Sequence, residues 1–426
     1  MSEPTAVVTA PAGRLARLQL LTPLQHRDYR LVWFGESVSL LGDQFHYVAL
    51  SWLVLGMTGS GLALGTVLLA SALPRGAFLL VGGVLSDRVS PRMLMLASNV
   101  VRAMLTAAIA GLVLGAQVQI WQLVLAGAIF GTVDAVFFPA INTIVARLVP
   151  AGRLLSANAL LHGTQQLMNT VGPALAGFAI AFIGVGTAFV IDAASFAVAA
   201  VALWLVRNDG LASSAPTERS EVAGSRPSLL ASLAEGTRSV LGDPVLRILV
   251  ILSTAFNVAF TGPIVVGLPW LVRVRFDGDA SMLGLLLAAF GGGAVVGIVM
   301  AGSVPKPRTL GGLVLGVATG LGAGLGAIGV ASWPATALIL LLVGCGVGFL
   351  DVSIISWTQA RTETHLLGRT MSFLMLGSVV AAPLSLVVAG ALVDTNATAM
   401  FLIAGGLILG VSAAGLATGL PRRMVW

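Results

Sequence analysis

Long apolar segments, separated by short polar breaks, run along almost the whole 426-residue chain. A helix needs about 20 mostly apolar residues to cross a bilayer, because the hydrocarbon core is about 30 Å thick. The residues are 57% hydrophobic and only 9% charged, whereas soluble domains have about 25% charged residues. We therefore predict an all-α integral membrane protein with twelve transmembrane helices. The expected spans cover residues 30–56, 61–83, 93–114, 120–146, 154–182, 186–206, 245–271, 281–302, 309–331, 334–358, 369–393 and 398–420.

One long polar break interrupts this pattern at residues 207–244, which are rich in Ser, Arg, Glu and Ala. Such a composition predicts a flexible linker, and the apolar residues near its end predict an amphipathic helix on the membrane surface. The break separates two predicted six-helix bundles. The expected organisation is a cytoplasmic N-terminal arm (1–29), a first bundle (30–206), the cytoplasmic linker (207–244), a second bundle (245–420) and a cytoplasmic tail (421–426).

The positive charge of the chain is distributed as in a membrane protein. With both termini in the cytoplasm, 19 of the 23 Lys and Arg residues fall on the cytoplasmic side and two fall outside. This asymmetry follows the positive-inside rule, which sets the orientation of membrane spans. It accounts for the formal net charge of +6 without a nucleic-acid partner. The sequence therefore predicts a multi-pass protein with cytoplasmic termini.

The two halves of the sequence repeat each other. Gly65 in the second expected span corresponds to Gly284 in the eighth, 219 residues later, and Asp134 in the fourth corresponds to Asp351 in the tenth, 217 residues later. An ordered series of such matches predicts two homologous bundles related by a pseudo-twofold axis along the membrane normal. Many secondary transporters are built from repeats of this kind, with the substrate site between them.

The first expected span contains two acids within an apolar segment. Glu36 and Asp43 are seven residues apart, so they share one helical face with Ser39 and His46. A charged side chain at mid-membrane costs from about 3 to over 10 kcal/mol. We therefore expect Asp43 to face a polar cavity or to be protonated, and to be the main coupling or substrate-facing acid, assisted by Glu36. The alternatives are a structural hydrogen bond for Asp43 and pairing of Glu36 with Arg30.

Other polar residues at membrane depth complete the predicted cavity. Asp134 and Asp351 are expected either to line it or to pair with Arg75 or Arg102, and Asp192 is expected to be structural, near the outer end of the sixth span. The remaining candidates are Asn257, Thr261, His162, Gln165, Gln166 and Asn169. The last four form a polar stripe in the fifth span, whose alternative role is to join helices by hydrogen bonds.

The segment 82–92, between the second and third expected spans, reads GGVLSDRVSPR. It resembles the loop 2–3 signature of the major facilitator superfamily, in which a Gly is followed four residues later by Asp, then Arg, then a basic residue after a turn. The resemblance implies a conformational latch at the cytoplasmic face. Its residues would be Gly83, Asp87, Arg88 and Arg92. Ser90 and Pro91 replace the usual turn glycine, and the second half of the chain lacks the corresponding Asp.

Further segments are similar to the branch of 12-span drug/proton antiporters, which includes macrolide-efflux and enterobactin-exporter proteins. Among them are Leu41-Gly42-Asp43, Trp52-Leu53-Val54-Leu55, Leu73-Pro74 and Gly172-Pro173-Ala174-Leu175-Ala176-Gly177. The resemblance covers nearly the whole chain. It implies the fold of that superfamily, with spans 1, 4, 7 and 10 lining a central cavity.

Taken together, these features predict a secondary transporter that exports amphipathic small molecules, cations among them, by proton antiport with alternating access. A dedicated siderophore exporter and a lipid or lysolipid flippase of the same fold are alternatives. An integral membrane enzyme is a remote one, because no phosphate-binding loop or HExxH zinc motif occurs and Cys345 is the only cysteine. The expected partners are a small-molecule substrate, protons and membrane lipids. We expect a monomer in the bacterial inner (plasma) membrane, without cofactor or metal.

Overall fold

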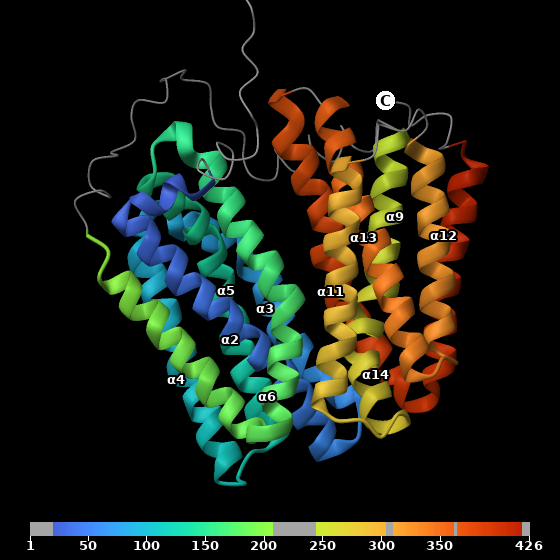
Figure 1. Ribbon diagram of the computed structural model, residues 1–426, viewed down its shortest axis with the longest axis horizontal. Helices are drawn as coiled ribbons and strands as arrows, with labels where there is room; N and C mark the ends of the chain where they lie inside the picture. Colours follow the sequence, from blue (N-terminus) through green and yellow to red (C-terminus); the bar gives the residue numbers. More distant parts are fainter. Residues whose placement is uncertain (1–19, 208–243, 304–309, 362–363, 420–426) are drawn as a thin grey trace, which may run out of the picture.

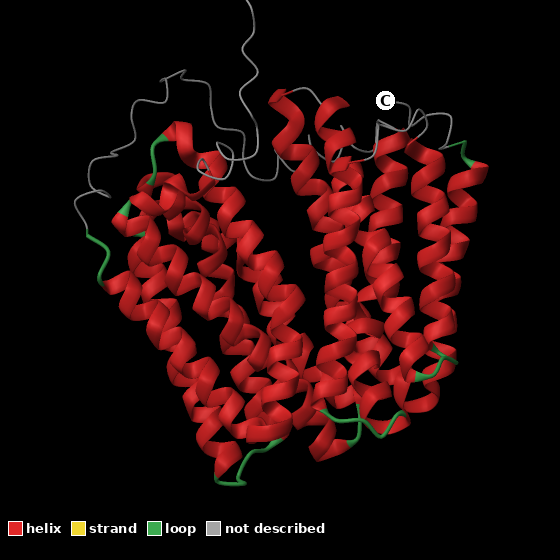
Figure 2. Ribbon diagram, viewed as in Figure 1, coloured by secondary structure: helices red, strands yellow, loops and turns green. Residues whose placement is uncertain are grey.

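The computed structural model describes residues 20–207, 244–303, 310–361 and 364–419. Within these ranges every regular element is a helix, and the connections are short (Figure 2). Two groups of helices lie side by side (Figure 1). The N-terminal group contains η1 (Thr22–Gln25), α2 (Arg27–Thr58), α3 (Gly61–Arg88), α4 (Pro91–Leu114), α5 (Ile120–Leu148), η2 (Ala151–Arg153) and α6 (Leu154–Trp204). The C-terminal group contains α9 (Pro244–Gly262), η3 (Pro263–Gly267), α10 (Leu268–Trp270), η4 (Leu271–Arg275), α11 (Ala280–Ser303), α12 (Leu310–Ile328), α13 (Trp333–Arg361) and α14 (Thr364–Ala417).

Ten helices in the described ranges are long and apolar enough to cross a membrane, judged by length and composition. This finding confirms the predicted class of an all-α integral membrane protein. Two of the ten, α6 and α14, have 51 and 54 residues, far more than one crossing requires. Each contains one non-helical residue, Gly184 in α6 and Asn396 in α14. These kinks lie where the sequence predicts a break between two spans.

Helix boundaries follow the local sequence. The first span ends at Gly59, whose φ of 65° is the left-handed conformation that glycine adopts at little cost. The segment 82–92, which the sequence places in a loop, is different: α3 continues to Arg88, and α4 begins at Pro91. Proline disfavours a helical residue before it but suits the first turn of a new helix, so the break is confined to Val89 and Ser90.

The seventh expected span is an irregular helix. After α9, the chain continues through the π-helical turns η3 and η4, with the short α10 between them. Pro263 and Pro269 lie in this stretch, and each removes one backbone donor from the regular hydrogen-bond pattern. Irregular π-helical turns of this kind occur often at functional sites. The linker and its predicted amphipathic helix lie almost entirely outside the described residues.

The two groups pack together through a pair of glycines that the sequence repeat relates. A Cβ atom at Gly65 on α3 would lie 2.5 Å from the carbonyl oxygen of Leu386 on α14, and one at Gly284 on α11 would lie 2.5 Å from the carbonyl oxygen of Pro173 on α6. Because neither position can accommodate a side chain, the backbones approach closely at both interfaces. The repeat read from the sequence therefore corresponds to two similar contacts between the groups.

A single carboxylate joins the two groups at the end where α2 passes into α3. Asp394 on α14 accepts hydrogen bonds from the hydroxyl of Ser60 at 2.6 Å and from the backbone N–H groups of Gly61 at 2.6 Å and Leu62 at 3.0 Å. The side chain thus caps the first turn of α3 from the other group. From this end the two groups spread apart toward the opposite end of the molecule (Figure 1).

Candidate functional site

The most highly charged part of the described membrane spans is in the N-terminal group. Asp134 on α5 accepts a hydrogen bond from Arg102 on α4 and lies 3.0 Å from Nε of Arg75 on α3. Arg102 is buried, with 3% of its surface exposed, whereas the side chain of Arg75 is about half exposed. Of the two sequence alternatives for Asp134, pairing with an arginine is the one that the structure shows, and it involves both arginines.

Aromatic rings surround the buried guanidinium of Arg102. Its central carbon lies 4.5 Å from the ring centroid of Phe137, 5.2 Å from that of Phe130 and 5.6 Å from that of Phe196. Aromatic faces attract cations, and the attraction is stronger where water is excluded. The rings therefore stabilise a permanent positive charge at a depth where it would otherwise be costly.

Glu36 and Asp43 on α2 belong to the same electrostatic cluster. Both interact with the charges of Arg102 and Asp134, and Asp43 also interacts with Glu36 and Asp192. The cluster thus contains four carboxyl groups and two guanidinium groups, those of Arg75 and Arg102. If every carboxyl group were ionised, two negative charges would have no guanidinium partner. Such an excess favours binding of protons or of a cation.

A second buried pair lies next to this cluster. Nδ1 of His46 on α2 is 2.9 Å from Oδ2 of Asp192 on α6, and Asp192 is completely buried. The sequence predicts a structural Asp192 near the outer end of the sixth span; in the structure it lies eight residues beyond the kink at Gly184 and contacts His46 on α2. Sequence reasoning noticed that His46 shares a face with Asp43, but nothing in the sequence pointed to its partner.

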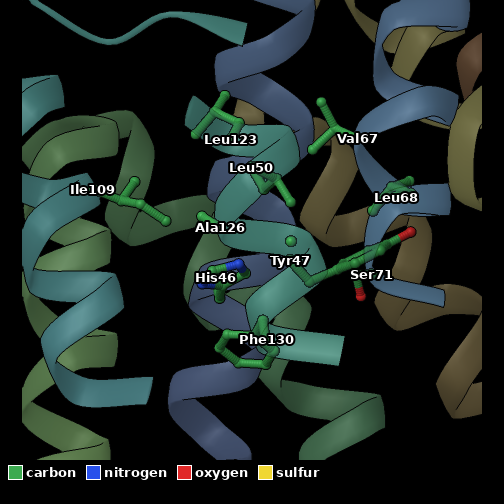
Figure 3. Close-up of a pocket in the computed structure, with 11 residues that line it drawn as sticks. His46, Tyr47, Leu50, Val67, Leu68, Ser71, Ile109, Leu123, Ala126 and Phe130 are labelled. Carbon is green, nitrogen blue, oxygen red and sulfur yellow. The ribbon is translucent and has the colours of Figure 1, made fainter. Parts of the chain in front are cut away.

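His46 also lines a cavity of about 160 Å³ within the N-terminal group (Figure 3). Tyr47 and Ser71 are the other polar residues of its wall. The remaining wall is apolar, formed by Leu50, Val67, Leu68, Ile109, Leu123, Ala126, Gly127 and Phe130. A mostly apolar pocket with a few polar groups is the usual composition of a small-molecule site.

The predicted residues of the fifth span and of the C-terminal group lie apart from the charged cluster. Asn169 on α6 accepts a hydrogen bond from the side chain of Gln44 on α2 at 3.1 Å, so this member of the polar stripe joins two helices. His162 and Gln165 are exposed and Gln166 is partly exposed. In the C-terminal group, Asp351 on α13 is exposed, Thr261 on α9 is partly exposed, and the side-chain amide of Asn257 donates to the carbonyl of Ser253 at 2.8 Å.

Of the predicted latch, only Arg92 has a described side chain. Its guanidinium donates hydrogen bonds to the backbone carbonyls of Leu203 at 2.8 Å and Trp204 at 2.6 Å, at the end of α6. Arg92 therefore joins the start of α4 to the end of the sixth span. The side chains of Asp87 and Arg88 and the surroundings of Gly83 lie outside the described part of the structure. Among the side chains that are described, no three potential ligands lie close enough to hold a metal ion.

Acids buried in the spans of a polytopic helical protein are typical of membrane transporters. The chain is a member of the Major Facilitator Superfamily, whose family model matches residues 32–386. This membership confirms the resemblance seen in the segment 82–92.

Known relatives are similar along most of their length. The multidrug efflux pump Tap of Mycolicibacterium fortuitum is 29% identical over 92% of this chain and 95% of its own. Macrolide efflux protein A of Streptococcus pyogenes is 22% identical over 89% of this chain and 92% of its own. Among solved structures, the nucleoside transporter NupG superposes with a TM-score of 0.73 at 14% identity, over 92% of this chain and 99% of its own. This last similarity is one of fold.

Proposed function

We propose that the protein exports amphipathic small molecules in exchange for protons. The main support for this proposal is the cluster of Glu36, Asp43, Asp134 and Asp192. Its carboxyl groups outnumber the guanidinium groups beside them. Similarity to efflux proteins over most of the chain supports the direction of transport. The largely apolar spans suit a substrate with a large apolar surface better than a sugar, which requires many aligned hydrogen-bond partners.

In this mechanism, a proton and a cationic substrate compete for the same negative charge. Arg75 and Arg102 both bind Asp134, so Asp43 and Glu36 are the acids of α2 that have no guanidinium bonded to them in the described structure. A proton bound to Asp43 removes the charge that holds a cation, and its release restores that charge. Competition at one site couples the two movements without simultaneous binding.

The proposed arrangement in the membrane has twelve crossings, because α6 and α14 each turn back at their kink. Both termini are then cytoplasmic, and the Lys and Arg distribution supports this orientation in a bacterial inner membrane. The end closed by Asp394 faces outward, and the groups spread apart toward the cytoplasm (Figure 1). Alternating access would proceed by rocking of the two groups about the substrate site.

Purified protein in proteoliposomes tests the proposal, with ethidium as an amphipathic cation. An outwardly directed proton gradient should drive ethidium accumulation, and a protonophore should abolish it. Matched assays with a ferric siderophore and a fluorescent lysolipid test the alternative exporters of this fold. Ethidium transport that ignores the proton gradient would contradict proton antiport, and transport of only the siderophore or the lysolipid would contradict drug export.

A further inference from the structure

In the mechanism proposed above, His46 has no role, and Asp192 contributes only its charge to the cluster of acids. Asp192 is completely buried, and its Oδ1 has no hydrogen-bond partner among the described residues. An isolated buried carboxylate is costly unless a positive charge or a proton compensates it. Arg75 and Arg102 both bind Asp134. Within the described part of the chain, His46 is therefore the group in contact with Asp192 that can supply a positive charge.

The imidazole of His46 lies between Asp192 and the cavity of Figure 3. Nδ1 is 2.9 Å from Oδ2 of Asp192, whereas Nε2 has no hydrogen bond to any described residue and the ring forms part of the cavity wall. Phe130 and Phe189 flank the ring, with centroids 5.2 Å and 5.3 Å from it. These two rings fix its orientation, so one edge contacts the carboxylate and the rest is available to the cavity.

The cavity provides space for water beside this ring. Its volume of about 160 Å³ is well above the roughly 10–15 Å³ that a single water molecule requires. Its wall comes from the later part of α2 and α4 and the early part of α3 and α5, for example Leu50, Ile109, Val67 and Leu123. Because these parts meet at the α2–α3 end, the cavity lies in the half of the membrane that faces outward in the proposed orientation.

We propose that His46 and Asp192 form a proton-binding pair that links this cavity to Asp43. A proton from cavity water binds Nε2 of His46, and the resulting imidazolium donates its Nδ1–H to Oδ2 of Asp192. The net charge of the pair changes from −1 to zero. Asp43 lies one helical turn before His46 on α2 and interacts with the charge of Asp192, so protonation of the pair changes the field at Asp43.

The helices around the pair also carry the charged groups of the cluster that contains Asp43. They are Glu36 and Asp43 on α2, Arg75 on α3, Arg102 on α4 and Asp134 on α5. The inference rests on the proposed proton antiport and deepens it, because it assigns the outward-facing proton path to named residues. Two experiments distinguish a failure of the proton-binding pair from a failure of the proposed antiport.

The first experiment observes the imidazole directly. The chain contains four histidines, so the ¹⁵N-histidine spectrum of the purified protein can be assigned by single substitutions, with His46→Asn identifying the signal. We expect the neutral ring of His46 to carry its proton on Nδ1 and the ring to gain a second proton, on Nε2, as the sample is acidified. In the Asp192→Asn protein, the midpoint of this change should differ by at least about 1 pH unit. A ring that stays neutral throughout, or a midpoint that Asp192→Asn leaves in place, overturns the pair.

The second experiment measures coupling in proteoliposomes with ethidium. The amide nitrogen of His46→Asn can replace Nδ1 as a donor to Asp192, but it cannot bind a proton. We expect gradient-driven accumulation to fall at least about tenfold, since ionisable partners shift each other's protonation by this order, while ethidium exchange at equal pH continues. His26→Asn, just before α2 and in contact with Arg153 rather than with the acids of the cluster, is the matched control and should retain both activities.

The outcomes of the two experiments are distinguishable. Undiminished gradient-driven transport in His46→Asn overturns the proton-binding pair, as does loss of exchange together with accumulation, which would indicate a structural role. If the wild-type protein exchanges ethidium without any response to the proton gradient, or does not move ethidium, the proposed antiport of this cation is wrong. The ¹⁵N spectra then still decide whether His46 and Asp192 bind a proton together.

Discussion

Among single side chains, Arg102 lies in the environment that is least favourable to a charge. It is buried between three phenylalanine rings and hydrogen-bonded to Asp134. Removing one partner of a buried ion pair costs about 3–5 kcal/mol, because the other charge stays buried alone. Arg75 binds the same carboxylate from a half-exposed position, where an ion pair contributes about 0–1 kcal/mol. The two arginines should therefore differ in their effect on stability.

Because Asp134 keeps Arg75 as a partner, we expect Arg102→Met to lower the free energy of unfolding by less than this, about 1.5–3 kcal/mol for a hydrogen bond to a charged group, and Arg75→Met to lower it by less than about 1 kcal/mol. Thermal unfolding of the detergent-purified variants measures both. In the double variant Arg102→Met/Asp134→Leu, neither charge remains, and much of the loss should be recovered. Equal destabilisation by the two single variants would show that the aromatic rings and the burial of Arg102 do not distinguish it from Arg75.

Substitution of Asp43 tests the proposed coupling of drug and proton movement at a single carboxyl group. Asp43→Asn has a similar shape and mimics a permanently protonated acid, so the fold should persist. Drug-driven proton release from detergent-purified protein should fall at least about tenfold, a ratio equivalent to 1.4 kcal/mol, and Glu36→Gln should reduce it less. If both variants release protons like the wild type, the coupling acid is elsewhere, with Asp134 or Asp351 as the next candidates. A variant that does not fold would favour a structural role for Asp43.

A helix end outside the membrane should make the stability of the folded protein depend on pH. Just before α11, the carboxylate of Asp279 accepts hydrogen bonds from the hydroxyl of Ser281 at 2.5 Å and the backbone N–H of Met282 at 3.0 Å. These bonds, with that of Ser281 as the largest contribution, hold the pKa of Asp279 below its usual value. A lowered pKa in the folded state means that the stabilisation is complete above the ordinary pKa of Asp and is lost as the pH falls through the lowered value.

Replacing Asp279 should therefore lower the free energy of unfolding by an amount that depends on pH. We expect Asp279→Ala to destabilise the protein by about 1 kcal/mol at pH 7, the usual cost of losing a helix cap, and by much less near pH 3. Melting temperatures of wild type and variant at both values measure this difference. A cost that is the same at both pH values would mean that the charge of Asp279 has no part in it.

Asp394 caps α3 from the other group, so its three hydrogen bonds exist only while the two groups are closed at the α2–α3 end. Asp394→Ala should weaken the closed state by about 1–2 kcal/mol, which shifts its population about 5- to 30-fold. Spin labels at Met57→Cys and Thr395→Cys, in a Cys345→Ser background, should report a larger share of long distances. Asp28→Asn, at a surface acid bonded to the neighbouring Arg27, is the control. Unchanged distances in Asp394→Ala would contradict the closing role.

Much of the architecture was predictable, because a helix that lies in a membrane needs a long apolar segment that can be read directly from the sequence. Apolar length located the spans, and the repeat of Gly65 and Gly284 predicted corresponding positions that the structure places in similar contacts. The pairing of buried groups was not predictable. His46 and Asp192 are 146 residues apart, and Ser60 and Asp394 are 334 residues apart. Such contacts depend on how helices pack, which periodicity within one helix does not encode.

The same limit applies to the predicted site residues. Asp43 and Glu36 share a helical face in the sequence, and the structure brings them into one electrostatic cluster with Asp134. Asp351 is the sequence counterpart of Asp134, yet it is exposed and has no arginine among its described contacts. The repeat therefore preserves the position of an acid but not its surroundings, because the arginines that bind Asp134 occur in only one half. The acids and arginines of the two halves therefore differ, although Gly65 and Gly284 make similar contacts.

The glycine contacts between the two groups lead to a prediction for their movement. The interface between α6 and α11 depends on Gly284, where a Cβ atom would lie 2.5 Å from the carbonyl oxygen of Pro173. At Gly292, two turns further along α11, a Cβ atom would have nothing within 4 Å. Substituting valine at either position changes helix propensity equally, so any difference between the two variants comes from the contact between the groups.

We expect Gly284→Val to separate α6 from α11, to reduce ethidium transport in proteoliposomes at least about tenfold and to lower the melting temperature by several degrees, as overpacking by about 1–3 kcal/mol would do. Gly292→Val should remain near wild type in both measurements. Spin-label distances across the outward end should lengthen in Gly284→Val alone, because the clash acts only when the groups are closed there. If the two variants behave alike, close approach at Gly284 does not govern the closed state, which would then depend on other contacts between the groups, such as Gly65 with Leu386 and the hydrogen bonds of Asp394.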